Sequence, residues 1–344
     1  MDDTKLPVQS IIIPIRNEEK FIASTVKYLQ EQDYPKEKFE IIIVDGHSSD
    51  GTPEIIKRLS SEDPRIRVLH NPKRLSSAAR NIGAKAATGE IITYIDGHTF
   101  IDNPKLLRNI AVAMSEKEVT VLSRPQFLET PDNTPFQRAV SLARRSILGH
   151  GLDSTIYLAE DKYVGPSSSG ASYKREIFDK VGYFDERFDA AEDWEFNYRV
   201  HLAGYGSFSS LGFAVYYYPR ATLKGLFYQM KRYGVGRFRF FRKHRAGLGS
   251  GALFPVLLVA GIPMLLVLAV LWPIFVPLLL LAAGVYVLAN LSFSIYIAAR
   301  HGWGYLSKSP FIFLAIHWGL GWGFISESVN SLLGRRPWPV PAKK

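Results

Sequence analysis

The sequence has no cysteine among its 344 residues, so it forms no disulfide bond, which agrees with a cytosolic location. It also lacks the Gly-x-x-x-x-Gly-Lys loop of ordinary ATPases and the Gly-x-Ser-x-Gly turn of esterases. The start of the chain, from Met1 to Lys5, carries acidic residues and is not followed by a signal-peptide pattern. We therefore expect the N-terminal half to stay in the cytosol.

Charge is missing from Gly251 to about Tyr296, where the chain has no Asp, Glu, Lys or Arg. Because a bilayer-spanning helix needs about 20 apolar residues, this run predicts two spans, near 252–272 and 274–298, with a turn between them. A third apolar segment, 310–333, carries His317 and Glu327 and is either another span or a packed interfacial helix. The pattern predicts a multi-pass protein of the plasma membrane.

Positive charge is concentrated just before the first of these spans. The net charge is +10, and the segment 231–245 supplies a large part of it (Lys231, Arg232, Arg237, Arg239, Arg242, Lys243 and Arg245). Positive charge beside a span marks the cytoplasmic side and favours anionic lipid headgroups over nucleic acid as the partner. We expect four parts: a folded domain 1–218, basic interfacial helices 219–250, a transmembrane region 251–334 and a basic tail 335–344.

Strand-like and helical patterns alternate through the first 100 residues. Strands are expected at 9–15, 40–44, 67–70 and 91–95, and helices at 21–30, 53–60 and 76–87. Further helices are expected at 174–180 and from 190 to 199, whereas 131–164 has an irregular pattern that suggests a mobile loop or an insertion. This order predicts an α/β fold with a mostly parallel sheet, Rossmann-like, and ligands at the carboxyl ends of its strands.

Asp96-Gly97-His98 ends the expected strand at 91–95. Gly97 allows the backbone to bend, so that a carboxylate and an imidazole converge on one hard cation, Mn²⁺ or Mg²⁺, that holds a diphosphate. The alternative is that Asp96 caps the next turn and His98 is an ordinary surface residue.

Six motifs in order resemble family 2 inverting glycosyltransferases of the GT-A type. They are Pro14 with Asn17-Glu18-Glu19, Asp45-Gly46-x-Ser48-x-Asp50-Gly51-Thr52, Ala79-Arg80-Asn81-x-Gly83, Gly89-Glu90, Asp96-x-His98 and Glu192-Asp193. The resemblance covers about the first 245 residues and is strongest to the membrane-bound glucosyltransferases of succinoglycan-type exopolysaccharide synthesis, which likewise carry Asp-x-His where most relatives carry Asp-x-Asp.

The resemblance implies roles for these positions in binding a UDP-sugar. Pro14, Arg16 and Glu18 would lie beside uracil and ribose, and Asp45 would accept a hydrogen bond from uracil or ribose, although Asp45 alone reads equally well as a turn residue. Arg80 would contact the diphosphate or the donor sugar. Asp96 would reach the metal or the ribose, and His98 would ligate the metal. Because imidazole is neutral, the site would favour Mn²⁺ over Mg²⁺ more than two carboxylates do.

The resemblance also implies a catalytic base. Asp193 would take the proton of the acceptor hydroxyl, and Glu192 would help to position it. Acidic residues also favour a helix N-terminus, and both readings hold together. Further on, Gln229-x-x-Arg232-Tyr233 resembles the Gln-x-x-Arg-Trp signature of processive members, with Arg232 near the diphosphate. An amphipathic interfacial helix explains the same residues equally well, and the Tyr leaves processivity open.

The sequence therefore predicts a membrane-anchored, metal-dependent hexosyltransferase that faces the cytoplasm. Its donor is a UDP-sugar, UDP-glucose by resemblance, and its acceptor is a lipid-linked oligosaccharide in cell-surface polysaccharide synthesis. Two alternatives stay open: transfer to polyprenyl phosphate itself, and a membrane assembly or translocation component whose transferase domain has lost its activity.

Overall fold

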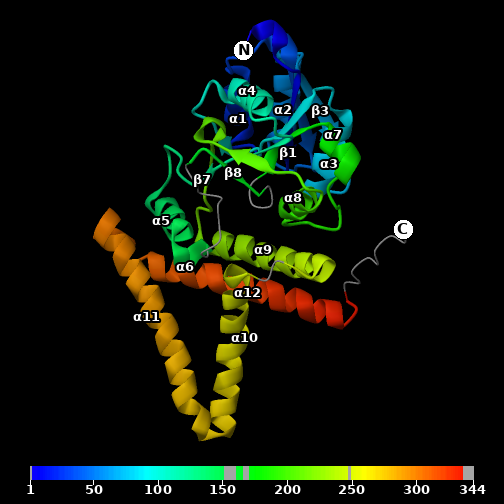
Figure 1. Cartoon of the computed structure of the whole chain (residues 1–344). Coiled ribbons are helices and arrows are strands. Elements are labelled where there is room, and N and C mark those ends of the chain that lie inside the picture. The colour runs from blue at the N-terminus through cyan, green and yellow to red at the C-terminus, as the bar shows by residue number, and fades with distance from the viewer. Residues whose placement is uncertain (1, 151–159, 166–169, 247–248, 336–344) are drawn as a thin grey trace. The chain divides into compact units, whose positions relative to one another are not determined.

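The structure is a computed structural model that describes residues 2–150, 160–165, 170–246 and 249–335 (Figure 1). The chain divides into two compact units, Met1–Thr130 with Thr155–Tyr218, and Pro131–Ser154 with Pro219–Lys344. The first is an α/β unit and the second is helical. Residues 131–150, which we had placed in the N-terminal domain, thus group with the C-terminal helices.

An eight-stranded sheet, in the order β3-β2-β1-β4-β9-β6-β10-β8, forms the centre of the first unit. A smaller sheet has the order β5-β11-β7. The strands are β1 Gln9–Ile15, β2 Phe39–Asp45, β3 Ile66–His70, β4 Ile91–Tyr94, β5 Thr99–Phe100, β6 Val121–Ser123, β7 Gln126–Phe127, β8 Lys162–Val164, β9 Gly170–Lys174, β10 Ser207–Ser209 and β11 Val215–Tyr217.

The apolar β1 strand supplies both faces of the core. Ile11 and Ile13 pack with one cluster and Ile12 with another, because successive side chains of a strand point to opposite faces. Residues of α1, α2 and α4 cover the first face, and residues of α3, α7 and α8 cover the second. These helices are α1 Ile22–Gln30, α2 Thr52–Glu62, α3 Ser76–Ala86, α4 Leu106–Glu116, α7 Glu176–Val181 and α8 Glu192–Leu202.

The strand directions bring the carboxyl ends of several strands to one edge of the sheet. β1 runs parallel to β2 and β4. β9 is antiparallel to both β4 and β6, so β6 points the same way as β4. The carboxyl ends of β1, β2, β4 and β6 therefore lie on the same edge. The predicted mostly parallel α/β sheet is confirmed, with β9 as an antiparallel strand inside it.

The second unit contains α5 Pro135–Arg145, α6 Ile147–His150, α9 Leu223–His244, α10 Ser250–Leu271, α11 Val276–His301 and α12 Ser309–Leu332. α5 lies in the stretch with an irregular sequence pattern, and a capping box between Thr134 and Gln137 starts it. α10 and α11 form a hairpin (Figure 1). By length and composition, three segments of the described chain are able to cross a membrane: Gly251–Leu271, Pro273–His301 and Ser309–Leu332.

α12 packs closely along α9 through glycines. A Cβ atom added at Gly234 of α9 would overlap the backbone of α12 at Leu320, and one added at Gly323 of α12 would overlap the backbone of α9. Arg239 Nε donates to Glu327 Oε1 at 2.7 Å between the same two helices, and both side chains are largely buried. The two polar positions that made 310–333 unlike an ordinary span, His317 and Glu327, are thus buried in contacts with neighbouring helices.

Candidate active site

The loops that follow β1 and β2 are joined by hydrogen bonds at the carboxyl edge of the sheet. Asn17 adopts a left-handed backbone with φ 59°, its N–H donates to Ser48 Oγ at 2.8 Å, and its side-chain oxygen accepts from Ser49 N at 2.8 Å. Glu19 accepts from Gly51 N at 2.8 Å. The Asn-Glu-Glu and Asp-Gly-x-Ser motifs therefore hold each other in place.

Asp45 lies at the end of β2 with its carboxylate turned to its own loop, where it accepts from Ser48 N at 3.2 Å. Pro14 is half-buried on β1, opposite Val44, and Arg16 is exposed just beyond the strand. The structure thus places Pro14, Arg16 and Asp45 on neighbouring strand ends.

His98 is oriented by Glu18. The Nδ1–H of His98 donates to Glu18 Oε1 at 2.8 Å, and the side chains are 30% and 17% exposed. Gly97 is required between Asp96 and His98, because a Cβ there would meet Ile15 and Glu18. Glu18 was predicted to lie beside uracil and ribose, and the structure adds a contact of its carboxylate with the imidazole of His98. A carboxylate in this position fixes the ring of a metal-binding histidine.

Arg80 of α3 links the two acidic motifs. Its Nη2 donates to Asp96 Oδ1 at 3.1 Å, and its Nε lies 3.6 Å from Glu192 Oε1. The guanidinium lies over the ring of Tyr94, with the centroid at 5.0 Å. Burial disfavours the charge, but Asp96, Glu192 and Asp193 outweigh it and raise the pKa of Arg80 above its ordinary value. Asp96, Arg80 and Glu192 thus form one charged cluster.

Asp193 lies at the start of α8 beside this cluster. Solvent reaches the side chain. The protein atoms packed around its carboxyl still reduce its hydration, and this effect and the negative charge of Glu192 raise the pKa of Asp193 to about 6, against the opposing charge of Arg80. Ala191, just before the pair, has a left-handed backbone with φ 60°, which is unusual for a residue with a side chain. An accessible carboxyl with a raised pKa has the properties of a general base.

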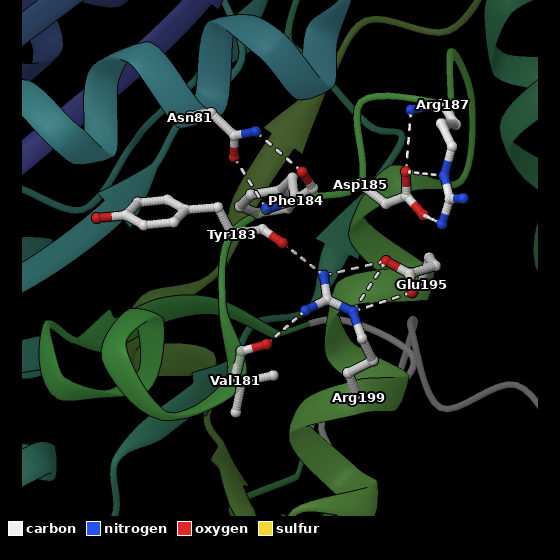
Figure 2. Close-up of polar contacts among 8 residues, drawn as sticks. All are labelled: Asn81, Val181, Tyr183, Phe184, Asp185, Arg187, Glu195 and Arg199. Carbon is white, nitrogen blue, oxygen red and sulfur yellow. Dashed lines mark hydrogen bonds and ion pairs between the residues drawn. The ribbon is translucent and has the colours of Figure 1, made fainter. Parts of the chain in front are cut away.

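Figure 2 shows how α8 is held in position. Arg199 donates from Nη1 to the backbone oxygen of Val181 and from Nη2 to that of Tyr183, both at 2.7 Å, and pairs with Glu195 one turn earlier. Two hydrogen bonds between Asn81 and the backbone of Phe184, both 2.9 Å long, tie α3 to the same segment. The helices that carry Arg80 and Asp193 therefore share one support.

The comparisons with known proteins identify the family. The sequence model of the family described as glycosyl transferase family 2 matches residues 10–182. The succinoglycan biosynthesis protein ExoA of Rhizobium meliloti (strain 1021) is 34% identical over 319 residues, which are 90% of this chain and 92% of that protein. The chain belongs to glycosyl transferase family 2. The predicted enzyme class, a glycosyltransferase, is thereby confirmed.

Two further similarities concern this family 2 transferase. A dolichyl N-acetyl-α-D-glucosaminyl phosphate 3-β-D-2,3-diacetamido-2,3-dideoxy-β-D-glucuronosyltransferase of Methanococcus voltae is 29% identical over 237 residues, 68% of this chain and 74% of that protein. The structure of the mannosyltransferase PcManGT from Pyrobaculum calidifontis, in complex with GDP-Man and Mn²⁺, matches with a TM-score of 0.59 and 20% identity over 97% of this chain and 90% of that one. The second similarity confirms the predicted GT-A fold.

Sequence reasoning missed one residue of this transferase, Arg124, which follows β6 at the same edge of the sheet. Arg124 is only 5% exposed, and its Nη2 donates to the hydroxyl of Tyr217 at 3.0 Å. Its Nε and Nη1 have no hydrogen-bond partner in the described part of the chain. The ring of Tyr217 lies 6.2 Å from that of His98, between centroids. No local motif surrounds Arg124, so the three-dimensional structure was needed to find it.

The last two predicted site residues of the transferase lie in the second unit. Gln229 and Arg232 are on α9, where Gln229 Nε2 donates to the hydroxyl of Tyr233 at 3.4 Å and Arg232 is exposed. The other predicted positions, from Pro14 to Asp193, all lie in the first unit.

Proposed function

We propose that this enzyme transfers a hexose, glucose by resemblance, from a UDP-sugar to a lipid-linked saccharide with inversion at the anomeric carbon. The observation that carries the proposal is Asp193, an accessible carboxyl with a pKa raised to about 6, placed beside the Arg80–Asp96–Glu192 cluster. The names of two relatives support the choice of substrates, because one concerns succinoglycan biosynthesis and the other a sugar on dolichyl phosphate.

In this mechanism Asp193 accepts the proton of an acceptor hydroxyl while that oxygen forms a bond to the anomeric carbon. The bond between the anomeric carbon and the phosphate oxygen breaks on the opposite side, and UDP leaves with both electrons of that bond. Glu192 keeps the pKa of Asp193 raised, so the carboxylate is a stronger base than an ordinary aspartate. Arg80 and Arg124 supply positive charge toward the diphosphate, which matches the two guanidinium nitrogens of Arg124 that lack a hydrogen-bond partner among the described residues.

The donor set at the end of β4 fits a divalent cation that is shared with a diphosphate. Asp96 offers a carboxylate, and His98, oriented through Nδ1 by Glu18, would bind through Nε2. In the described part of the chain no group of three or more His, Asp or Glu side chains forms a metal cage. This suits Mn²⁺ or Mg²⁺, which take remaining ligands from phosphate and water. A bound cation would neutralise charge that develops on the leaving UDP.

We further propose the remaining donor contacts and the location. Pro14, Arg16 and Asp45 would lie beside uracil and ribose, and Gln229 and Arg232 would act near the diphosphate. The apolar helices would anchor the enzyme in the plasma membrane, with the first unit on the cytoplasmic face. A lipid-linked acceptor is concentrated in the plane of the membrane, which favours an anchored enzyme.

The test is UDP release by the full-length chain in detergent, measured over a panel of UDP-sugars with a lipid-linked acceptor and with Mn²⁺, Mg²⁺ or EDTA. We expect turnover of one donor, loss of turnover in EDTA, and a decrease of at least about 100-fold in Asp193→Asn. Asp179→Asn, which removes an exposed carboxylate from α7, is the matched control. Product analysis distinguishes transfer to a saccharide from transfer to polyprenyl phosphate. Absence of donor binding under every condition would contradict the proposal and favour the non-catalytic alternative.

A further inference from the structure

The second unit contains a cavity of about 220 Å³ that the proposed chemistry does not use. Side chains of α5, α6, α9, α10, α11 and α12 line it, so six helices of this unit meet around one space. Much of the wall is apolar, with Leu148, Met230, Phe254, Phe293 and Ile316 among its residues. Three of the helices, α10, α11 and α12, are those with the length and composition of membrane spans.

The polar part of the wall is cationic. Arg144, Arg237, His150 and His317 line the cavity, and none of the described residues around it is an Asp or a Glu. Arg237 makes no hydrogen bond and no ion pair with another described residue. The Arg237 side chain is half-buried in this wall. A partly desolvated guanidinium without a counter-ion is less favourable than a paired one, and an anion in the cavity would supply the missing partner.

The ionisation of the lining agrees with this picture. Burial lowers the pKa of Arg237, and the neighbouring Arg144 lowers it further. Burial and the same two arginines lower the pKa of His150 to about 3, so His150 is neutral at pH 7. Burial makes the larger contribution to both shifts, and the contributions of the neighbouring arginines show that positive charges gather at this wall. A bound anion would oppose this electrostatic contribution at Arg237 and His150.

His317 makes two polar contacts in the wall of the cavity. His317 Nε2 lies 2.8 Å from the backbone oxygen of Leu148, and its Nδ1 lies 3.1 Å from the hydroxyl of Tyr286. Since a carbonyl oxygen only accepts, Nε2 carries the hydrogen, and Nδ1 accepts from Tyr286. His317 thus fixes α6 against α11 and α12. Arg144 also lies over the ring of Tyr233, with the centroid at 5.9 Å.

We propose that this cavity binds the phosphate group of an anionic membrane lipid, with Arg144 and Arg237 on the phosphate and the acyl chains along the apolar helices. A guanidinium pair matches phosphate oxygens. The apolar lining favours a lipid over a free inorganic anion, because alkyl chains gain free energy by leaving water. Binding would join α5 and α6 to the helices of the span region, so that the lipid becomes part of the folded second unit.

The experiment is lipid binding by the full-length chain in nanodiscs that contain dioleoyl phosphatidic acid or, for comparison, only dioleoyl phosphatidylcholine. Retention of phosphatidic acid is measured by native mass spectrometry after release from the disc. We expect selective retention of one phosphatidic acid and at least a tenfold weaker retention in Arg237→Gln. Arg242→Gln removes the same charge from the same helix but from a residue that does not line the cavity, and we expect it to retain the lipid.

Two additional measurements separate a loss of lipid binding from a loss of protein stability. The melting temperature of each variant is measured in detergent without lipid, and Arg237→Lys, which keeps the charge, is expected to recover part of the binding. Equal loss in Arg237→Gln and Arg242→Gln would indicate surface attraction only and would overturn the proposal. Displacement of the lipid by millimolar inorganic phosphate would also overturn it, because the cavity would then be a site for a free anion.

Discussion

Asp193 accepts a proton in the proposed reaction, so it must be ionised before transfer begins. Its pKa is raised to about 6, first because the packed protein atoms reduce the hydration of its carboxyl and then by the negative charge of Glu192. A base is active above its pKa, so we expect turnover to decrease as the pH falls through about 6 and to be constant above about 7. Initial rates of UDP release between pH 5 and 8.5 measure this. Because Asp193 and Glu192 interact, the value obtained belongs to the pair.

Arg80 gives a second prediction for the dependence of turnover on pH. Its positive charge lowers the pKa of Asp193, so Arg80→Met should raise that pKa and move the acid limb of the pH profile to higher pH. A decrease in the plateau rate is also expected, since Asp96 and Glu192 lose their cation. Arg58→Met changes an exposed arginine on α2 and should leave the profile unchanged. An acid limb that stays in place in Arg80→Met would argue against the cluster as the source of the tuning.

The element on which the site depends most is α8, and Arg199 holds it. Removing this side chain in Arg199→Met breaks two hydrogen bonds to backbone oxygens and the ion pair with the buried Glu195. We expect a loss of about 3 kcal/mol in the free energy of unfolding of the first unit and a lower turnover number. Chemical denaturation followed by tryptophan fluorescence measures the first quantity. Arg187→Met, which removes a more exposed arginine paired with Asp185, should cost less.

Sequence patterns predict best those helices and strands whose conformation depends on residues close together in the sequence. β1 was predicted with its observed bounds, because seven residues between turn signals are mostly β-branched and buried on both faces. No strand was predicted at 170–174, and a helix was expected from 174, yet β9 forms there. Its strand character comes from pairing with β4 and β6, which lie about 80 and 50 positions away in sequence. α4 also escaped prediction.

The same distinction holds among site residues. Asp96, His98 and Asp193 belong to short motifs, whereas the place of Arg124 is evident only from its contact with Tyr217, which is 93 positions further along the chain. Arg199 was only the end of an expected helix, and its partners at Val181 and Tyr183 are known only from the folded structure. Short-range patterns therefore indicated the chemistry of the site, but not the residues that support it.

At the scale of the whole molecule, the mode of membrane attachment is testable. The proposed anchor is apolar, whereas α9 is basic, and surface attraction is screened over about 3 Å in 1 M salt. We expect the full chain to remain in the membrane pellet in 1 M NaCl and at alkaline pH, and to be extracted only by detergent. Immunoblots of the pellet and supernatant distinguish these results. Release by salt alone would show that the basic segment, and not the α10–α11 hairpin, holds the protein.

The hairpin of α10 and α11 also bears on the number of times that the chain crosses the membrane. In the proposed membrane arrangement α10 and α11 cross the bilayer and return, so the C-terminal end of α9 and the N-terminal end of α12 would open to the same compartment. α12 contacts α9 through Gly234 and Gly323, at points where a single added methyl group would collide with backbone. A third crossing by α12 would have to carry α9 with it or break these contacts. While the two helices remain packed, the number of crossings stays even.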